Sequence, residues 1–473
     1  MSTEQTSSVR RTLNLTGRPY TIAVVVVLSI VALSAFTGYY GFPILGFVVR
    51  PEQVTPVLLL ILVLVSADGR AGLLQVVRRR SIWVLLAFIA LNLISTALFS
   101  PSLVKSASIL TWFVLDTILF ASLLALGPIL SRFERALVWS IVPWALIGII
   151  SATLANQLKL TGFGVDFDWL YQVWVARGTS LEANIYATFI ILLLLLFVWR
   201  YHQRPWVVVV VSALASFGLV ASQTRTSFIA LLGSLVVLIL AGFLFRKSVT
   251  HVRARIISAG TAFVVVLAVF FASGAISSFL YEQAPLNNDG ATVAPSDPAT
   301  PSAAPGASST PTSSSSTPIV PDIDNPDTKD KLGDLSLGGG TFVFRLQVFD
   351  LAKQEMNGVN LWIGNGTNTF GLRHEQPGTP GVAGHIIMLP IQIVYDVGLI
   401  GLALLVLFFV LLVRETPRHR RPILLAVIGA IAVTSTLTSS FWFAMIWIVL
   451  AVAAGSVRAR RGEPTASSTP QVG

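Results

Sequence analysis

Charge is what this sequence has least of. Only 11% of its 473 residues are Asp, Glu, Lys or Arg, whereas a soluble domain carries about a quarter. Because this small number of charges cannot cover a surface that faces water, a soluble globular fold is excluded. Hydrophobic residues make up 54% of the chain. They gather into runs approaching the length, about 20 residues, that crosses a bilayer as a helix.

Cysteine is absent, which excludes disulfides, thiol catalysis and cysteine-ligated metals.

The net charge of +10 does not indicate a nucleic-acid partner, because the basic residues lie in short clusters between apolar runs. The excess of Arg over Lys is typical of bacteria with GC-rich genomes. Residues 1–19 are polar, and no small-residue cleavage site follows the first apolar run, so we interpret them as a cytoplasmic tail.

The apolar runs predict an all-α polytopic membrane protein of about twelve transmembrane helices. Residues 20–280 are expected to hold helices 1–9, and residues 385–456 helices 10–12. The second run is short, and the last two form a tight hairpin. The runs begin near Tyr20, Val54, Ile82, Ala107, Ala136, Ala183, Val207, Ser227, Ile256, Ile386, Ile423 and Phe441.

Most of the 32 Lys and Arg residues fall in alternate short loops, which is the pattern of cytoplasmic loops. The clusters are at Arg78 to Arg80, at Arg200 and Arg204, at Arg253 and Arg255, and at Arg418 to Arg421. This alternation predicts that both ends of the chain are cytoplasmic, with residues 457–473 as a second tail. The bilayer is therefore the first expected partner.

Three segments on the predicted outer side are too long or too polar to be simple connections. They are residues 156–182, the turn SQTRTS around Arg225, and residues 281–384. Within the last, residues 287–334 are rich in Pro, Ser and Thr and are expected to be disordered. Residues 341–384 begin with FVFRLQVFDLAKQEM, whose apolar residues recur at helical spacing. We therefore expect a small, partly helical external domain between helices 9 and 10.

Four motifs lie in or beside these segments, in the order RGTSLEANIYA (177–187), SQTRTSFIALL (222–232), FRLQVFDLAKQ followed by IGNGTNTF, and GHIIMLPIQIVYDVGLIGL. Their order resembles the O-antigen ligase and O-antigen polymerase superfamily of bacterial polytopic transferases. The resemblance covers residues 177–413. Asp396 stands where that family more usually has Glu.

The resemblance implies a GT-C-like fold and a glycosyltransferase of polysaccharide biosynthesis in the inner (cytoplasmic) membrane. Such an enzyme moves a glycan from polyprenyl diphosphate to an acceptor hydroxyl at the outer face. It inverts the linkage and needs no metal or other cofactor. The implied partners are the lipid-linked donor and an acceptor that is a glycan, a lipid or a protein.

Arginine suits the leaving diphosphate, because its planar guanidinium binds phosphate oxygens in pairs. Arg225 is the first candidate, since it lies between two apolar runs where a charge is costly. Its structural alternative is an interfacial arginine that reaches the lipid headgroups. The resemblance adds Arg345, at the start of the external helix, and Arg177 as further diphosphate-binding residues.

The acceptor hydroxyl needs a general base that titrates near neutral pH, which favours histidine. His385, at the mouth of helix 10, is the candidate that the motif implies, and His374 is its rival. Asn184 is expected to hydrogen-bond at the start of its helix. Gly364 and Gly366 are expected to shape a turn.

Other functions stay open. Twelve helices also fit a polysaccharide or lipid transporter or flippase, although the two halves show no repeat. Asp166 and Asp168, with Glu182 nearby, could hold a metal in a transferase that uses a lipid-monophosphate sugar. A structural scaffold would leave the outer arginines and histidines unexplained. Asp116, inside a span, is expected to pair with a base or to relay protons.

Overall fold

The computed structural model is built almost wholly of helices. It describes residues 18–35, 42–44, 47–168, 173–180, 182–280, 348–374, 386, 388–436, 438 and 440–455. The helices before residue 281 are α1 (Arg18–Ala35), α2 (Pro51–Val65), α3 (Ala67–Val77), α4 (Arg80–Phe99), α5 (Leu103–Ala125), α6 (Pro128–Trp139), α7 (Ile141–Gln157), α8 (Ala183–Arg200), α9 (Pro205–Ala221), α10 (Arg225–Leu244), α11 (Val252–Phe271) and α12 (Ser273–Leu280).

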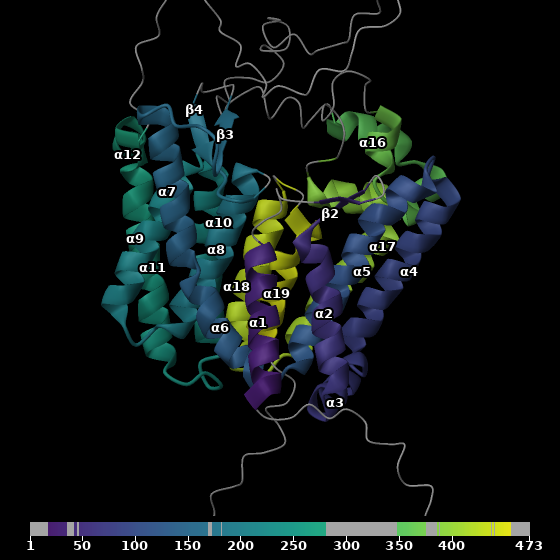
Figure 1. Ribbon diagram of the computed structural model, residues 1–473, viewed down its shortest axis with the longest axis horizontal. Coiled ribbons are helices and arrows are strands. Elements are labelled where there is room, and N and C mark those ends of the chain that lie inside the picture. Colours follow the sequence, from purple (N-terminus) through teal and green to yellow (C-terminus); the bar gives the residue numbers. More distant parts are fainter. Residues whose placement is uncertain are drawn as a thin grey trace, which may run out of the picture.

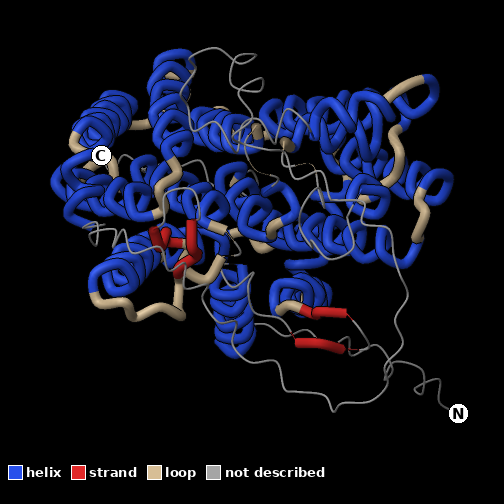
Figure 2. The backbone as a smooth tube through the Cα atoms, turned by 90° about the horizontal axis from the view of Figure 1, so that it is seen from above, coloured by secondary structure: helices blue, strands red, loops and turns tan. Residues whose placement is uncertain are grey.

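The later part of the chain supplies several short helices and the last long ones. Residues 348–355 are helical, and they are followed by α15 (Gly358–Ile363), α16 (Thr369–His374), α17 (Leu389–Glu415), α18 (Arg421–Ser435), the 3₁₀ turn η1 (Ser440–Trp442) and α19 (Ala444–Ala454). Two antiparallel hairpins pair β1 (Phe42–Ile44) with β2 (Phe47–Val49), and β3 (Val165–Asp168) with β4 (Val173–Ala176). Seen from above, the two hairpins lie apart from each other (Figure 2).

The long helices run between two ends of the molecule (Figure 1). One end carries α3, α6 and the first residues of α4, α11 and α18, and we call it the basic end. Glu134 on α6 contacts Arg200 and Arg420 there, and Glu415 accepts a hydrogen bond from the Arg80 amide. The opposite end carries α12, the β3–β4 hairpin, α15 and α16, and we call it the loop end. The basic clusters that the sequence assigns to alternate loops thus gather at one end.

Within the described residues, seven helices are long and apolar enough to cross a bilayer. An eighth span is possible if α2 and α3, which meet at an angle of 112°, count as one broken span. Shorter apolar helices lie at Tyr20–Ala32 and at α9, α18 and α19. The structure therefore has the form of a multi-pass membrane protein, in agreement with the apolar runs. The bend into α3 and the two hairpins were not predicted.

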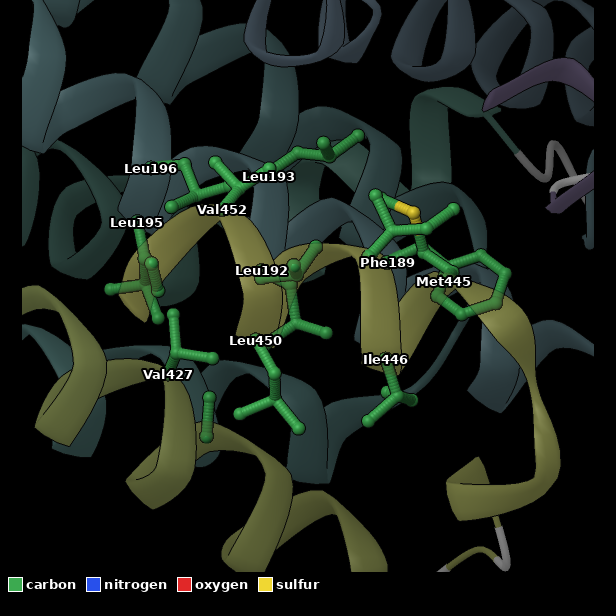
Figure 3. Close-up of a cluster of buried hydrophobic side chains, with 14 of the residues drawn as sticks. Phe189, Leu192, Leu193, Leu195, Leu196, Val427, Met445, Ile446, Leu450 and Val452 are labelled. Atoms are coloured by element: carbon green, nitrogen blue, oxygen red, sulfur yellow. The ribbon is translucent and has the colours of Figure 1, made fainter. Parts of the chain in front are cut away.

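Helix α8 lies at the centre of the bundle. Every side chain from Ile185 to Trp199 is buried, because α8 packs against α6, α7, α9, α10, α11, α18 and α19. Figure 3 shows its Phe189, Leu192 and Leu196 among side chains of α18 and α19 such as Val427, Met445 and Leu450. A helix that is apolar all round must be buried in protein or lipid, and here protein surrounds it. Because α8, α10 and α18 pack together, their residues at the loop end lie close to one another.

Candidate functional site

A turn at residues 364–367 packs against a break in α17. Gly398 lies inside α17 with φ +74°, so the helix is interrupted there. A Cβ atom on Gly398 would lie 2.1 Å from the carbonyl oxygen of Trp362, and one on Gly364 would lie 2.3 Å from that of Asp396. Gly364 and Gly366 have φ values of +81° and +92°, which side chains rarely allow. The glycines thus let two backbones touch.

The turn supplies the hydrogen bonds that the broken helix lacks. The Asn365 amide donates to the Tyr395 carbonyl at 2.7 Å, and the Gly366 amide donates to the Asp396 carbonyl at 3.0 Å. Ser95 on α4 donates its hydroxyl to the same Asp396 carbonyl at 3.0 Å. Backbone groups at a break within a span need such partners because lipid offers none. The turn at residues 364–367 is therefore fixed to α4 and α17.

A second set of contacts ties this turn to α4. The Thr367 amide donates to Thr96 Oγ1 at 3.0 Å, and the Thr96 hydroxyl donates to Thr367 Oγ1 at 3.1 Å. The Thr367 hydroxyl in turn donates to the Asn92 side-chain oxygen. All three side chains are buried. These buried hydrogen bonds hold the turn against α4, and Asn92 Nδ2 is left without a hydrogen-bond partner among the described residues.

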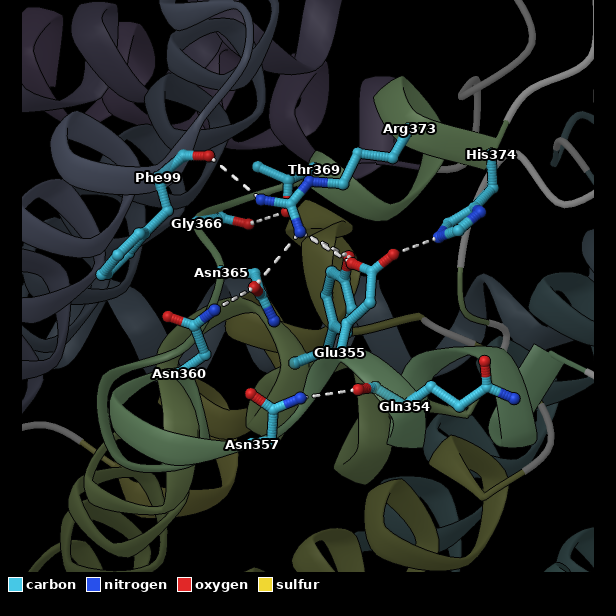
Figure 4. Close-up of polar contacts among 11 residues, drawn as sticks. Phe99, Gln354, Glu355, Asn357, Asn360, Asn365, Gly366, Thr369, Arg373 and His374 are labelled. Atoms are coloured by element: carbon cyan, nitrogen blue, oxygen red, sulfur yellow. Dashed lines mark hydrogen bonds and ion pairs between the residues drawn. The ribbon is translucent and has the colours of Figure 1, made fainter.

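Charged and ionisable side chains converge beside this turn, among them Glu355, Arg373 and His374 (Figure 4). Glu355, at the end of helix 348–355, accepts hydrogen bonds from Arg373 Nη1 and from His374 Nε2, each at 2.7 Å. The Tyr395 hydroxyl on α17 also donates to Glu355. We call Glu355, Arg373, His374 and Tyr395 the carboxylate cluster. It joins helix 348–355 and α16 to α17.

Arg373 and His374 differ in what else they contact. Arg373 also donates to the Phe99 carbonyl and to the Asn365 side-chain oxygen, each at 3.2 Å, so its guanidinium is largely committed to the protein. His374 uses Nε2 for Glu355, and its ring lies 4.6 Å from that of Phe370. A carboxylate that holds one ring nitrogen sets the orientation of the other, which is how general bases are positioned.

The pKa of Glu355 is displaced by this environment. Burial acts to raise its pKa, but the hydrogen bonds from Tyr395, Arg373 and His374 outweigh burial, so the pKa lies below its ordinary value of 4.5. The folded state therefore favours the carboxylate over the acid. A carboxyl group with a lowered pKa stabilises the fold above its unfolded pKa, and that stabilisation is lost as the pH falls through the folded pKa.

We expect Glu355→Gln to lower the Tm of the purified protein at about pH 7 and to have a shrinking effect below about pH 4.5. The reason is that wild type loses the charged partner of Arg373 as Glu355 takes up its proton. Thermal unfolding of both proteins in detergent, followed across this pH range, measures the difference. A Tm difference that stays constant down to about pH 3 would contradict the assigned carboxylate.

Two further predicted motifs meet at a small pocket of the loop end. Asn184 and Thr188 on α8 line it together with Thr226 and Ser227 on α10, and with Thr434 and Thr438. Arg225 is the first residue of α10, directly before two of these residues. Its side chain lies outside the part that the structure describes. The backbone of the Arg225 motif is thus brought beside Asn184, although the two are far apart in the sequence.

The segment after α18 connects this pocket with the start of α17. Thr438 lines the pocket, and Trp442 in η1 donates its indole N–H to the Gln392 side-chain oxygen at 3.4 Å. Gln392 lies in the first turn of α17 and precedes Tyr395 by three positions. The chain that follows the pocket residue Thr438 is therefore hydrogen-bonded, through Trp442, to the helix that carries Tyr395.

Arg177 lies on the same end, in the turn that follows β4. Its amide and that of Gly178 both donate to the Gly164 carbonyl, at 2.9 and 3.0 Å. Gly178 has φ +59° and packs against Trp144 and Tyr186. This packing places Arg177 close before the start of α8. His385 and Arg345, two further candidates from the sequence, lie outside the described residues.

The acidic candidates are placed differently. Asp166 is exposed on β3, and Asp168 ends that strand. No group of three or more His, Cys, Asp or Glu side chains suited to a metal ion occurs in the part of the chain that is described. Asp116 is buried in α5, and its Oδ2 has no hydrogen-bond partner.

Sequence reasoning overlooked Glu355, Arg373 and Tyr395. Glu355 and Arg373 lie 18 positions apart on two separate helices, so no helical or strand spacing signals their pairing. No protein-family model matches this chain, and no curated protein matches it.

Proposed function

We propose that this chain transfers or polymerises a glycan from polyprenyl diphosphate onto an acceptor hydroxyl at the loop end. One observation carries the proposal. The four motifs that resemble the O-antigen ligase and polymerase superfamily converge at one end of the molecule in two pairs. Asn184 and the start of α10 share a pocket, and the Gly364–Gly366 turn closes the break in α17.

The proposal places the loop end outside the cytoplasmic membrane of a bacterium. The basic end then faces the cytoplasm, as the excess of Lys and Arg in short loops requires. All twelve apolar runs, including the short helices α9, α18 and α19, would cross the bilayer. Short spans are accommodated by local thinning of the bilayer or by burial against neighbouring helices.

The reaction forms one bond and breaks another. The acceptor oxygen attacks the anomeric carbon, its proton passes to a base, and the bond from that carbon to the diphosphate oxygen breaks. The lipid diphosphate leaves with the bonding electrons, and a single displacement inverts the anomeric configuration. Cations must meet the charge that develops on the leaving group.

Arg225 is the proposed principal cation, with Arg177 and Arg345 as further diphosphate-binding residues. The start of α10 adds to this, because the partial positive charge of a helix N-terminus favours anions. Arg373 is assigned a different role, since its donors already serve Glu355, Asn365 and the Phe99 carbonyl. It holds the external segment in place.

The carboxylate cluster favours His374 as the base, because Glu355 already orients its ring. His385, which the motif resemblance implies, is the alternative base and is tested beside it. No metal ion is required in this scheme, since arginines supply the positive charge. The acceptor, whether a glycan, a lipid or a protein, distinguishes polymerase from ligase.

The test measures release of lipid diphosphate from a polyprenyl-diphosphate glycan by purified protein in detergent, with and without EDTA. We expect wild type to turn over in EDTA and Arg225→Ala to be slower by about 100- to 1,000-fold, the effect of losing one charge-stabilising donor. His385→Ala is assayed in parallel and slows the reaction only if His385 is the base.

Each variant needs a folded control, so size-exclusion profiles and Tm are compared with wild type. Arg132→Ala serves as a matched control, because Arg132 is an exposed arginine of α6 near the basic end. Wild-type turnover that EDTA abolishes would favour the metal-dependent reading with Asp166 and Asp168. Full activity in Arg225→Ala would remove Arg225 from the site.

A transporter or flippase is the second candidate, and the break in α17 favours it. Interrupted helices line the substrate sites of many transporters, and Asp396 beside the break is buried, with no hydrogen-bond partner for its Oδ2. Proteoliposomes separate the two functions. A transporter would move a lipid-linked glycan between leaflets without releasing lipid diphosphate, whereas the proposed enzyme would release it.

A further inference from the structure

A pocket of about 520 Å³ lies at the basic end, away from the proposed catalytic site. It is formed where α6, α8, α11 and the loop before α18 meet. Its charged lining consists of Arg135, Arg200, Arg204, Arg255, Arg420 and Glu134. Five arginines therefore share one pocket with a single carboxylate. Nothing in the proposed transfer reaction uses them.

The carboxylate holds two of these arginines in place. Glu134 is buried, and its two oxygens contact Arg200 Nη1 at 3.4 Å and Arg420 Nη2 at 3.0 Å. Arg420 also donates Nη1 to the Val452 carbonyl at 2.8 Å. A guanidinium has five N–H donors, so these contacts leave donors on both side chains for a ligand.

The aromatic residues of the pocket fix a third arginine. The Arg255 guanidinium lies 3.9 Å from the centre of the Trp199 ring, and its Nη1 donates to the Trp199 carbonyl at 3.3 Å. The neighbouring Tyr201 accepts a hydrogen bond from Trp139 Nε1 at 2.6 Å. Preformed cations of this kind lose little conformational entropy when an anion binds.

Arg135 and Arg204 complete the lining. Both are exposed, and neither forms an ion pair within the described structure. Burial, together with Arg420 and Arg255, lowers the pKa of His419 beside them. Like charges gathered in one pocket repel one another unless an anion neutralises them. Five guanidinium groups against one carboxylate therefore give the pocket a positive charge that favours an anion.

We propose that this pocket binds a phosphate-bearing anion. Arginine binds phosphate oxygens in pairs, and basic pockets between helix ends on the cytoplasmic side suit lipid headgroups. The C-terminal end of α8, the first turn of α11 and the residues directly before α18 form the pocket, so it lies where helices end, as headgroup-binding pockets do. The ligand is the headgroup of an anionic phospholipid or a soluble phosphate compound.

Binding is measured by native mass spectrometry and by equilibrium titration of the purified full chain. The probes are phosphatidylglycerol, phosphatidylcholine as a neutral lipid, and inorganic phosphate. We expect the double variant Arg135→Gln/Arg204→Gln to bind the anionic probe at least 10-fold more weakly. Binding should also weaken as salt is raised, since it depends on charge.

The matched control is Arg132→Gln/Arg253→Gln. Arg132 and Arg253 are exposed arginines of α6 and α11, two helices that form the pocket, but both lie outside the pocket lining. All four replaced side chains are exposed, so both double variants should keep the wild-type Tm. The control is expected to bind as wild type does.

The outcomes separate the two sources. Phosphatidylglycerol binding that phosphate at millimolar concentration does not displace identifies a lipid headgroup, whereas binding of phosphate alone identifies a soluble compound. Equal binding of phosphatidylglycerol by wild type and both double variants, or no binding of any anionic probe, would overturn the proposal. Glycan-transfer activity is not the readout, so the result is independent of the proposed function.

Discussion

Alanine at position 398 is expected to leave little stable protein in detergent. Gly398 has φ +74°, a conformation that costs a residue with a side chain on the order of 1–3 kcal/mol. The larger effect is steric, because the new Cβ would lie 2.1 Å from the Trp362 carbonyl oxygen. Neither backbone can move without breaking the hydrogen bonds from Asn365 and Gly366 to α17.

The measurement is Tm by fluorescence-detected size exclusion, together with hydrogen exchange at residues 364–367. We expect a Tm lower by about 10 °C or more, since a few kcal/mol is a large share of the stability of a fold. If α17 instead becomes a continuous helix, the protein survives but residues 364–367 lose protection. Both results follow from the close contact of the two backbones.

Gly233→Ala is the matched control. Gly233 lies in α10 and has no neighbour within 4 Å of an added Cβ, so alanine should be tolerated at wild-type Tm. A Gly398→Ala protein with both the Tm and the exchange pattern of wild type would show that the break in α17 does not depend on glycine.

Replacement of His374 by alanine is expected to slow glycan transfer by about 100- to 10,000-fold, the contribution of a general base. This expectation rests on the proposed function and on the hydrogen bond of His374 to Glu355. Glu355→Gln should slow transfer less, by about 10-fold or more, because Glu355 positions the His374 ring without touching substrate. It should also shift the pH profile of turnover, which a purely structural role would not do.

Glu415→Gln provides a control at the opposite end. Glu415 accepts hydrogen bonds from the Arg80 amide and from the Ser81 hydroxyl, so it joins two helices as Glu355 does. We expect full turnover in this variant. Loss of activity in His385→Ala but not in folded His374→Ala would transfer the base role to His385.

The sequence located the helices well because apolar runs report directly on a bilayer environment. Each predicted run coincides with a helix or with the pair α6 and α7. The bend between α2 and α3 was missed, since the polar residues Ser66, Asp68 and Arg70 were interpreted as the loop that ends a span. Gly69 permits the bend because its backbone lies against Val63, which no pattern of hydrophobicity reveals.

Of the candidate site, only the parts that lie within short sequence motifs were predicted. IGNG indicated a turn, and the turn is present, but its partner is the break at Gly398, 34 residues from Gly364 in the chain. The carboxylate cluster depends on the same long-range contact. Glu355 looks like one more charge on an external helix until the fold places Arg373 and Tyr395 beside it.

The enclosure of α8 has a consequence for how the protein is made. Helix α8 leaves the ribosome after α6 and α7, but before α9, α10, α11, α18 and α19, which cover its other sides. Its side chains from Ile185 to Trp199 must therefore first be solvated by lipid tails and later exchange that lipid for protein. Assembly of the bundle around α8 is complete only when the last helix, α19, has been inserted.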